Sequence, residues 1–221
     1  MSLAGIETRT LPVEQVRERH QFSRIKQDGP DAVLWGRAVS ERVQDWLDHL
    51  NSNDWPEERI VLKAEDVRSC LIQLFNETAC AADPNLAWLI DDITSLADQL
   101  STILDCADIR MRIEWVVDDA CRKFHVDNVQ ARLICTYSGP GTEYITSADI
   151  SRQDHIHCVP TGQPMLFKGK QWPGKQEVQL KHRSPPISGT GRRRLVVVLE
   201  PASIDPEDLH PSDIIFTYKS D

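Results

Sequence analysis

The second half of this chain is a series of short apolar runs, each of which ends at a turn residue. The strongest are IRMRIEWVV, ARLICTY before a Gly-Pro-Gly turn, and the β-branched run RRLVVVLEP, which ends at a proline. EYIT, PMLFKG and EVQLKH have the same character. Several short strands with turns between them favour an antiparallel sandwich or barrel. We therefore predict a β-sandwich over residues 105–221.

The first half, residues 1–104, has the spacing of amphipathic helices instead. Apolar residues recur at helical intervals in three segments: 39–50, 67–75 and 86–104. Pro84 stands where the third helix would begin. The short run 33–35 is a candidate strand. No linker rich in Gly, Ser or Pro divides the halves, so we expect an α+β protein in which a helical N-terminal half packs on the β-sandwich as one compact unit.

Charge and composition exclude several kinds of partner. The formal net charge is -9, which argues against nucleic acid or an anionic membrane because phosphate is bound by clustered Lys and Arg. The dense basic cluster at residues 192–194 is too short to change this. No apolar run approaches the roughly 18 residues of a membrane span. Without a secretory signal in the first residues, and with six cysteines that lack CxxC spacing, we expect a cytoplasmic protein with reduced thiols.

His125 and Asp127 form an HxD pair just before the run ARLICTY. Side chains two apart on a strand point to the same face, and imidazole and carboxylate together suit iron, manganese or zinc. The alternative is a solvent-facing pair at a strand end. His182 ends the alternating run EVQLKH, 55 positions after Asp127, and Arg192 follows 10 positions later. No P-loop, GxGxxG or GxSxG motif supports an NTPase, dinucleotide-binding or hydrolase function.

This order of residues resembles the double-stranded β-helix of the iron(II)- and 2-oxoglutarate-dependent oxygenases, a cupin- or jelly-roll-like fold. In that family an HxD pair is followed by a distal His, and then by a Lys or Arg that binds the distal carboxylate of 2-oxoglutarate. The resemblance covers residues 108–200. It implies that His125, Asp127 and His182 form a 2-His-1-carboxylate triad for iron, with 2-oxoglutarate as cosubstrate.

Three consecutive arginines leave the cosubstrate anchor ambiguous. Spacing after His182 favours Arg192, and Arg194 is the alternative because residues two apart on a strand share a face. By analogy with tyrosines on the equivalent strand of the oxygenases, Tyr137 is a candidate donor to the other end of 2-oxoglutarate. A half-buried aromatic at a strand end is the simpler interpretation of Tyr137.

The amino-acid sequence of the motifs resembles a second family. FHVDNVQARLICTYSGPGTEY together with HRSPP looks like an uncharacterised bacterial family called domain of unknown function 1826, over most of the chain. Its members are described beside genes for zinc-handling GTPases of the metallochaperone type. This resemblance implies a link to metal-homeostasis proteins but no particular chemistry.

Three hypotheses for function follow. The leading one is an iron(II)- and 2-oxoglutarate-dependent dioxygenase with an unknown substrate. The alternative is a non-catalytic cupin-like protein that binds zinc or iron in metal homeostasis, and the third is a metal-free interaction module. A separate metal site in the segment HIHC, residues 155–158, is less favoured than a loop with exposed histidines. Trp172 lies in a predicted loop and is a candidate for a pocket wall or lid.

Overall fold

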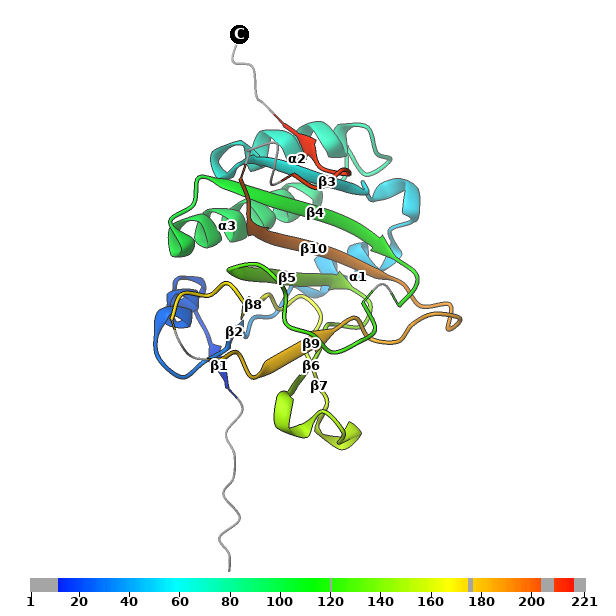
Figure 1. Ribbon diagram of the computed structural model, residues 1–221. Coiled ribbons are helices and arrows are strands. Elements are labelled where there is room, and N and C mark those ends of the chain that lie inside the picture. The colour runs from blue at the N-terminus through cyan, green and yellow to red at the C-terminus, as the bar shows by residue number, and fades with distance from the viewer. Residues whose placement is uncertain (1–11, 120, 175–176, 204–208, 217–221) are drawn as a thin grey trace, which may run out of the picture.

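The apolar runs of the second half form the strands of two facing sheets. The computed structural model describes residues 12–119, 121–174, 177–203 and 209–216 (Figure 1). The eight-stranded large sheet has the order β1-β2-β8-β5-β10-β4-β3-β11, and the small sheet has the order β7-β6-β9. The strands of the large sheet are β1 (Val13–Val16), β2 (Ala32–Trp35), β3 (Glu58–Lys63), β4 (Asp108–Val116), β5 (Ala131–Ser138), β8 (Met165–Lys168), β10 (Arg194–Pro201) and β11 (Ile214–Ile215). Those of the small sheet are β6 (Glu143–Thr146), β7 (His157–Cys158) and β9 (Leu180–Arg183).

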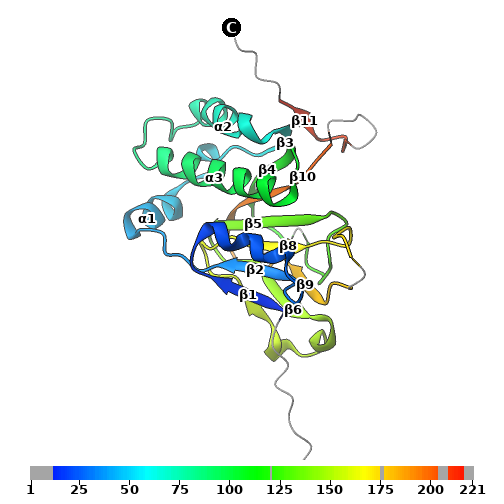
Figure 2. The same cartoon turned by 90° about the vertical axis from the view of Figure 1, so that its left-hand side faces the viewer.

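Three α-helices lie together against one face of the large sheet (Figure 2). They are α1 (Glu41–His49), α2 (Val67–Asn76) and α3 (Leu86–Leu104). Five short 3-10 helices connect the elements: Arg19–Lys26, Ser52–Asp54, Ala64–Asp66, Ser147–Asp149 and Gln153–His155. The apolar stripe of α3, which includes the fully buried Ile93 and Leu96, joins the same core as Leu133 of β5 and Val197 of β10. The prediction that these helices cover an outer face of the sheet is confirmed.

The other face of the large sheet packs against the small sheet. A second apolar core contains Val196 and Val198 of β10 together with Tyr144 of β6 and Leu180 of β9. Because successive side chains of a strand point to opposite faces, the central strands are buried on both sides and read as almost continuous apolar runs. The site described below occupies the space between the two sheets.

The first 104 residues are not simply a helical half. β2 pairs antiparallel with β8, and β3 pairs antiparallel with β4, so strands from this region extend the large sheet on both sides. The strand at 33–35 is confirmed as part of β2, but β1 and β3 were not predicted. In β3 the buried apolar segment is only Ile60 to Leu62 and is flanked by charged residues. So short a run carries little periodicity, and its place in the sheet comes from pairing with β4. Among the described helices, none combines the length and the apolar character that crossing a bilayer requires.

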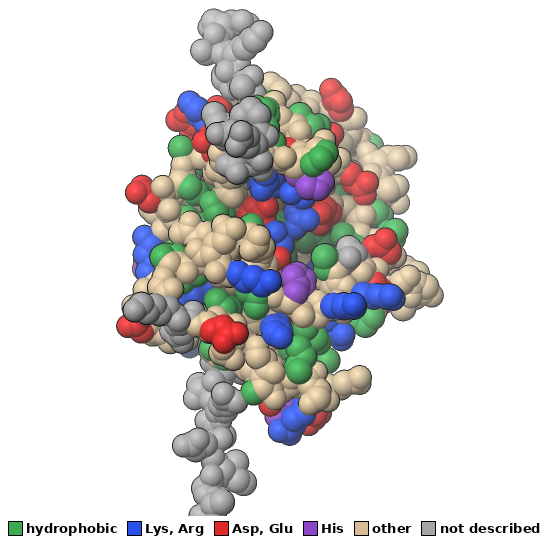
Figure 3. All heavy atoms as spheres, viewed as in Figure 1, with side chains coloured by type: hydrophobic (Ala, Val, Ile, Leu, Met, Phe, Trp, Pro, Cys, Tyr) green, Lys and Arg blue, Asp and Glu red, His purple; other side chains and the backbone are tan. Residues whose placement is uncertain are grey.

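A chain of ion pairs crosses the sheet and holds the segment that contains β11. Asp213 accepts from Arg59 Nε at 2.6 Å and from Arg110 Nη2 at 2.8 Å. Figure 3 shows basic and acidic side chains next to each other across the middle of the molecule in this view. Burial opposes the charge of Asp213, but hydrogen bonds from Arg110, Arg59 and the backbone N–H of His210 lower its pKa to about 2.

We predict that Asp213 stabilises the fold in a pH-dependent way. A carboxyl group whose pKa is lowered in the folded state contributes stability above its unfolded pKa of about 4 and loses it as the pH falls through the folded value. The wild type should therefore be more stable than Asp213→Asn at neutral pH. This difference in unfolding free energy should shrink between pH of about 4 and pH of about 2.

Urea denaturation at a series of pH values measures that difference. Asp91→Asn is the control, because Asp91 pairs with Arg68 on the surface, where ion pairs contribute little. A difference between wild type and Asp213→Asn that stays constant down to pH 2 would contradict the prediction.

Candidate metal centre

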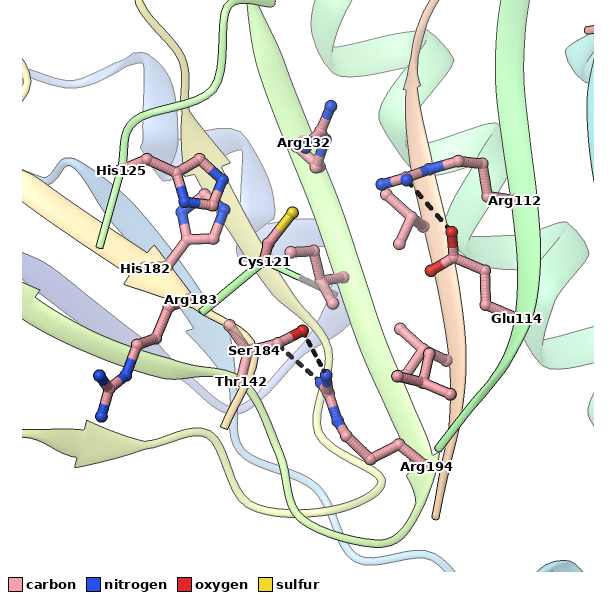
Figure 4. A pocket seen from close by; sticks show the side chains of 14 residues that line it. Arg112, Glu114, Cys121, His125, Arg132, Thr142, His182, Arg183, Ser184 and Arg194 are labelled. Atoms are coloured by element: carbon pink, nitrogen blue, oxygen red, sulfur yellow. Dashed lines mark hydrogen bonds and ion pairs between the residues drawn. The ribbon is translucent and has the colours of Figure 1, made fainter. Parts of the chain in front are cut away.

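The backbone bridge between His125 and His182 places two imidazoles side by side. The N–H of each residue donates to the carbonyl of the other, at 3.0 Å in both cases. His182 lies on β9, and His125 extends the small sheet beyond that strand. Residues directly opposite each other in an antiparallel pair direct their side chains to the same face. The two ring centroids therefore lie 4.7 Å apart (Figure 4).

Asp127 lies two positions after His125, and its carboxylate reaches both rings. Oδ1 is 3.3 Å from Nε2 of His125, and Oδ2 is 3.0 Å from Nε2 of His182. One ligand atom from each of the three residues lies within 4.8 Å of the other two. The prediction that the three side chains converge is thus confirmed. No other group of three His, Cys, Asp or Glu side chains converges in this way within the described ranges.

The atoms that face one another here suit a metal ion. Nδ1 of His125 lies 2.8 Å from the carbonyl oxygen of Lys123, which can only accept, so Nε2 keeps its lone pair in the neutral ring. Oδ2 of Asp127 is buried and accepts no hydrogen bond from the described residues. A buried carboxylate oxygen without a donor is costly, and a cation would relieve that cost. Two imidazoles and one carboxylate form a ligand set for iron(II), and zinc accepts the same donors.

At two of the three residues, Asp127 and His182, the local electrostatics favour the protonation state that a metal ligand needs. Burial lowers the pKa of His182, and Asp127 offsets this only in part. Burial opposes the charge of Asp127, but the two imidazoles and Arg132 more than offset this and hold its pKa well below the usual range. The hydrogen bond with Asp127 raises the pKa of His125. At neutral pH the site therefore combines an ionised Asp127 with a neutral His182, as metal binding requires.

The two histidines of the triad line a cavity of about 90 Å³ between the sheets (Figure 4). Its wall on the large sheet includes apolar side chains of β5 and β10 and the arginines of β4, β5 and β10. The lining residues are Arg112, Glu114, Val116, Cys121, His125, Arg132, Ile134, Thr142, His182, Arg183, Ser184, Arg194, Val196 and Val198. Apolar side chains therefore alternate with a larger number of polar and charged groups, which suits a small charged ligand.

Arg194 lies at the end of this cavity away from the histidines (Figure 4). The residue is only 2% exposed. Its guanidinium donates to the carbonyl of Pro140 at 2.7 Å and to three hydroxyls, of Ser184 at 2.9 Å, Thr136 at 3.1 Å and Thr142 at 3.2 Å. All four partners are neutral. Burial lowers the pKa of Arg194 to about 10, so the group is still a cation at neutral pH, and no carboxylate of the described residues forms an ion pair with it.

Arg192 does not share this position, and the expectation that it points into the cavity of His182 is wrong. Arg192 is exposed and precedes β10, which begins at Arg194. The shared-face argument requires an extended strand at both positions, and residues 192 and 193 are outside it. Arg194, which was the alternative candidate for the cosubstrate anchor, lines the cavity.

Tyr137 points away from the cavity. It lies on the helix-facing side of β5, is fully buried, and packs beside Trp55 and Trp88. Its hydroxyl donates to Oδ2 of Asp92 at 2.7 Å. Strand alternation explains this, because the cavity receives Arg132 and Ile134 of β5 and the opposite face receives Tyr137. Tyr137 is therefore a core residue and not a cosubstrate ligand.

Sequence reasoning missed Arg132 and Thr142, both of which line the cavity. The signal for Arg132 was present, since a charged residue inside an apolar strand requires a buried partner. Trp172 lines a separate groove that also reaches His125, in agreement with its predicted role as a pocket wall.

The segment HIHC shows no convergence on a metal. His155 pairs with Asp149, and His157 stacks on Tyr144 with ring centroids 5.3 Å apart. Cys158 is exposed. These contacts account for the histidines without an ion.

Comparisons with known proteins identify related chains and folds. The profile of a family described as "Protein of unknown function (DUF1826)" matches residues 17–200. The dioxygenase for auxin oxidation 1 of Arabidopsis thaliana, solved as a binary complex with 2-oxoglutarate, aligns over 92% of this chain and 97% of its own, with 10% identity and a TM-score of 0.54. The likeness to this structure shows a shared fold of the oxygenase type.

Two further structures align with lower scores. The rice dioxygenase for auxin oxidation aligns over 89% of this chain and 84% of its own, with 12% identity and a TM-score of 0.47. A bsmA homologue from Methylobium petroleophilum aligns over 86% and 95%, with 11% identity and a TM-score of 0.43. Comparison with curated protein sequences finds no match.

We predict that Tyr137→Phe lowers stability and leaves the cavity unchanged. The substitution removes the hydrogen bond to Asp92, which keeps its ion pair with Arg37, so the loss should be about 1 kcal/mol. Urea denaturation measures this loss, and calorimetry with added 2-oxoglutarate should give the same result for wild type and Tyr137→Phe. Tyr144→Phe is the control, because no described residue hydrogen-bonds the Tyr144 hydroxyl. Weakened 2-oxoglutarate binding in Tyr137→Phe would contradict the assignment of Tyr137 to the core.

Proposed function

The chain belongs to the DUF1826 family of proteins of unknown function, and we propose that it is an iron(II)- and 2-oxoglutarate-dependent dioxygenase. The observation that carries this proposal is a buried arginine, without an ion pair to a carboxylate among the described residues, in the cavity that is also lined by the two histidines of a His-Asp-His triad. The triad and Arg194 call for ligands of opposite charge. The triad suits a cation, and Arg194 suits an anion, so one anionic ligand that also reaches the metal would satisfy both.

His125, Asp127 and His182 would hold the iron. Three protein ligands on one side leave positions open for exogenous ligands, as in other 2-His-1-carboxylate centres. When bound, the iron would supply dioxygen chemistry, in which 2-oxoglutarate is decarboxylated to succinate and a C–H bond of the substrate is oxidised. The bridge between His125 and His182 fixes the spacing of the two imidazoles before any ligand arrives.

Arg194 would bind the far carboxylate of 2-oxoglutarate. A guanidinium offers two parallel donors to a carboxylate, which gives both direction and charge compensation. The hydroxyls of Thr136, Thr142 and Ser184 hold the guanidinium in place, so little side-chain freedom remains to be lost on binding. The structure most similar in fold among those described above is itself a 2-oxoglutarate complex, which supports this choice of anion.

The walls of the cavity would keep water from the reacting groups. Ile134, Val196 and Val198 present apolar side chains between the triad and Arg194. Exclusion of water strengthens electrostatic interactions inside such a site and limits side reactions.

The first test concerns the metal. Anaerobically purified wild type should bind iron(II), and His182→Ala should lose this binding because one of three ligands is removed. His157→Ala is the matched control, since His157 lies on the neighbouring part of the small sheet and stacks on Tyr144. Elemental analysis after dialysis measures both. Retention of iron by His182→Ala would exclude this centre, and tight zinc binding without any 2-oxoglutarate binding would favour a role in metal homeostasis instead.

The second test concerns the anion. Arg194→Ala should weaken 2-oxoglutarate binding to the metal-loaded protein by about 2–5 kcal/mol, the usual loss when one partner of a buried charge pair is removed. Arg192→Ala, two residues away but exposed, should bind like the wild type. Calorimetry under anaerobic conditions distinguishes them. Equal affinity in wild type and Arg194→Ala, or no binding by the metal-loaded wild type, would remove the oxygenase proposal.

A further inference from the structure

Among the described contacts of the cavity arginines, Arg132 makes a side-chain hydrogen bond to a residue of the triad. Its Nη1 donates to Oδ1 of Asp127. The opposite side of the guanidinium contacts Glu200, with Nη2 at 2.5 Å and Nε at 2.7 Å from Oε2. The Glu200 side chain is 3% exposed, so Arg132 is held between two carboxylates inside the protein.

The two oxygens of Asp127 consequently have different surroundings. Each oxygen lies near one imidazole, Oδ1 near His125 and Oδ2 near His182, but Oδ1 also accepts from Arg132, whereas Oδ2 accepts no hydrogen bond from the described residues. We propose that Arg132 is a positioning residue that holds Asp127 as a ligand through a single oxygen, Oδ2. This inference rests on the proposed metal site and adds what determines its geometry. A ligand that binds through one oxygen occupies one metal position and leaves the others open.

Glu200 holds the side of the Arg132 guanidinium that faces away from Asp127, and Glu200 is held in turn by Arg110. The other oxygen of Glu200, Oε1, accepts from Arg110 Nη1 at 3.1 Å, and Arg110 pairs in turn with Asp213. The three inner members of the series Asp127–Arg132–Glu200–Arg110–Asp213 therefore each have a partner on both sides. A guanidinium can bridge two carboxylates with separate, directed N–H groups, whereas a lysine ammonium is a point charge without that fork.

Charge alone would act in the opposite direction. A cation beside a metal ligand repels the ion and weakens its binding, while correct placement of the ligand strengthens it. A positioning role and a purely electrostatic role of Arg132 thus predict opposite changes in metal affinity when Arg132 is replaced by Gln. If Arg132 acts by position, both Arg132→Lys and Arg132→Gln weaken metal binding. If it acts by charge only, Arg132→Gln binds the ion more tightly and Arg132→Lys binds it like the wild type.

The test uses cobalt(II), which can replace iron(II) at imidazole and carboxylate sites and reports its coordination by visible absorption. Affinity is measured by competition with a chelating dye on the full chain. We expect about 10–100-fold weaker binding for both variants, the usual effect of losing a group that orients a metal ligand. The visible spectrum should also change, because a freed Oδ1 lets Asp127 bind through two oxygens.

Arg37→Gln is the matched control. Arg37 is also a half-buried arginine paired with a carboxylate, Asp92, which accepts from Tyr137 on the helix-facing side of the sheet. It should lose stability without changing cobalt affinity or spectrum. Glu200→Gln is the second variant, for use if the Arg132 variants do not fold. It removes the charge that holds Arg132 from behind and should weaken cobalt binding in the same direction.

The outcomes separate this inference from the function on which it rests. A wild type that binds no cobalt(II) would overturn both. A wild type that binds cobalt(II), with Arg132 variants of equal or tighter affinity and an unchanged spectrum, would overturn the positioning role and leave the proposed metal site intact. Unchanged affinity in Glu200→Gln would overturn it likewise.

Discussion

Burial of the large sheet on both faces is the constraint on which the rest of this structure depends. Helices cover one face, and the small sheet covers the other. Every side chain of β5 and β10 therefore enters a covered space, so any polar group on these strands must find a partner or a ligand there. Arg132, Glu200 and Arg194 are such groups, and all three lie on the inner face with the cavity.

The three buried charges resolve this constraint in different ways. Arg132 and Glu200 compensate each other within the protein, in a network that continues to Arg110. Arg194 has neutral partners only. A buried ion pair contributes little net stability, because desolvation of both groups offsets their attraction. A buried cation without a carboxylate is more costly still, and a site for an anion gives a physical reason to keep it.

The triad depends on a contact between segments far apart in the chain. His125 and His182 are joined by a two-bond backbone bridge, and Asp127 follows two positions later. This arrangement fixes the distance between the two imidazoles through the backbone, which is stiffer than side-chain packing alone. The resulting cavity has the two histidines of the triad at one end and Arg194 at the other, with apolar side chains of β5 and β10 in its wall.

The sequence by itself determined the elements with strong periodicity and the order of the site residues. The helices within 39–50, 67–75 and 86–104 and the strands of the second half were predictable, because each has several apolar positions at one spacing. The order and spacing of His125, Asp127 and His182 in the sequence were enough to select them as candidate metal ligands. The tertiary structure decided which side chains enter the cavity. Arg194 is the first residue of β10, whereas Arg192 lies before the strand and is exposed. Arg132 and Tyr137 both lie on β5, but they are an odd number of positions apart and so point to opposite faces of the sheet. Because β5 and β10 are buried on both faces, their apolar pattern does not show which parity faces the cavity, and pairing with the neighbouring strands decides it.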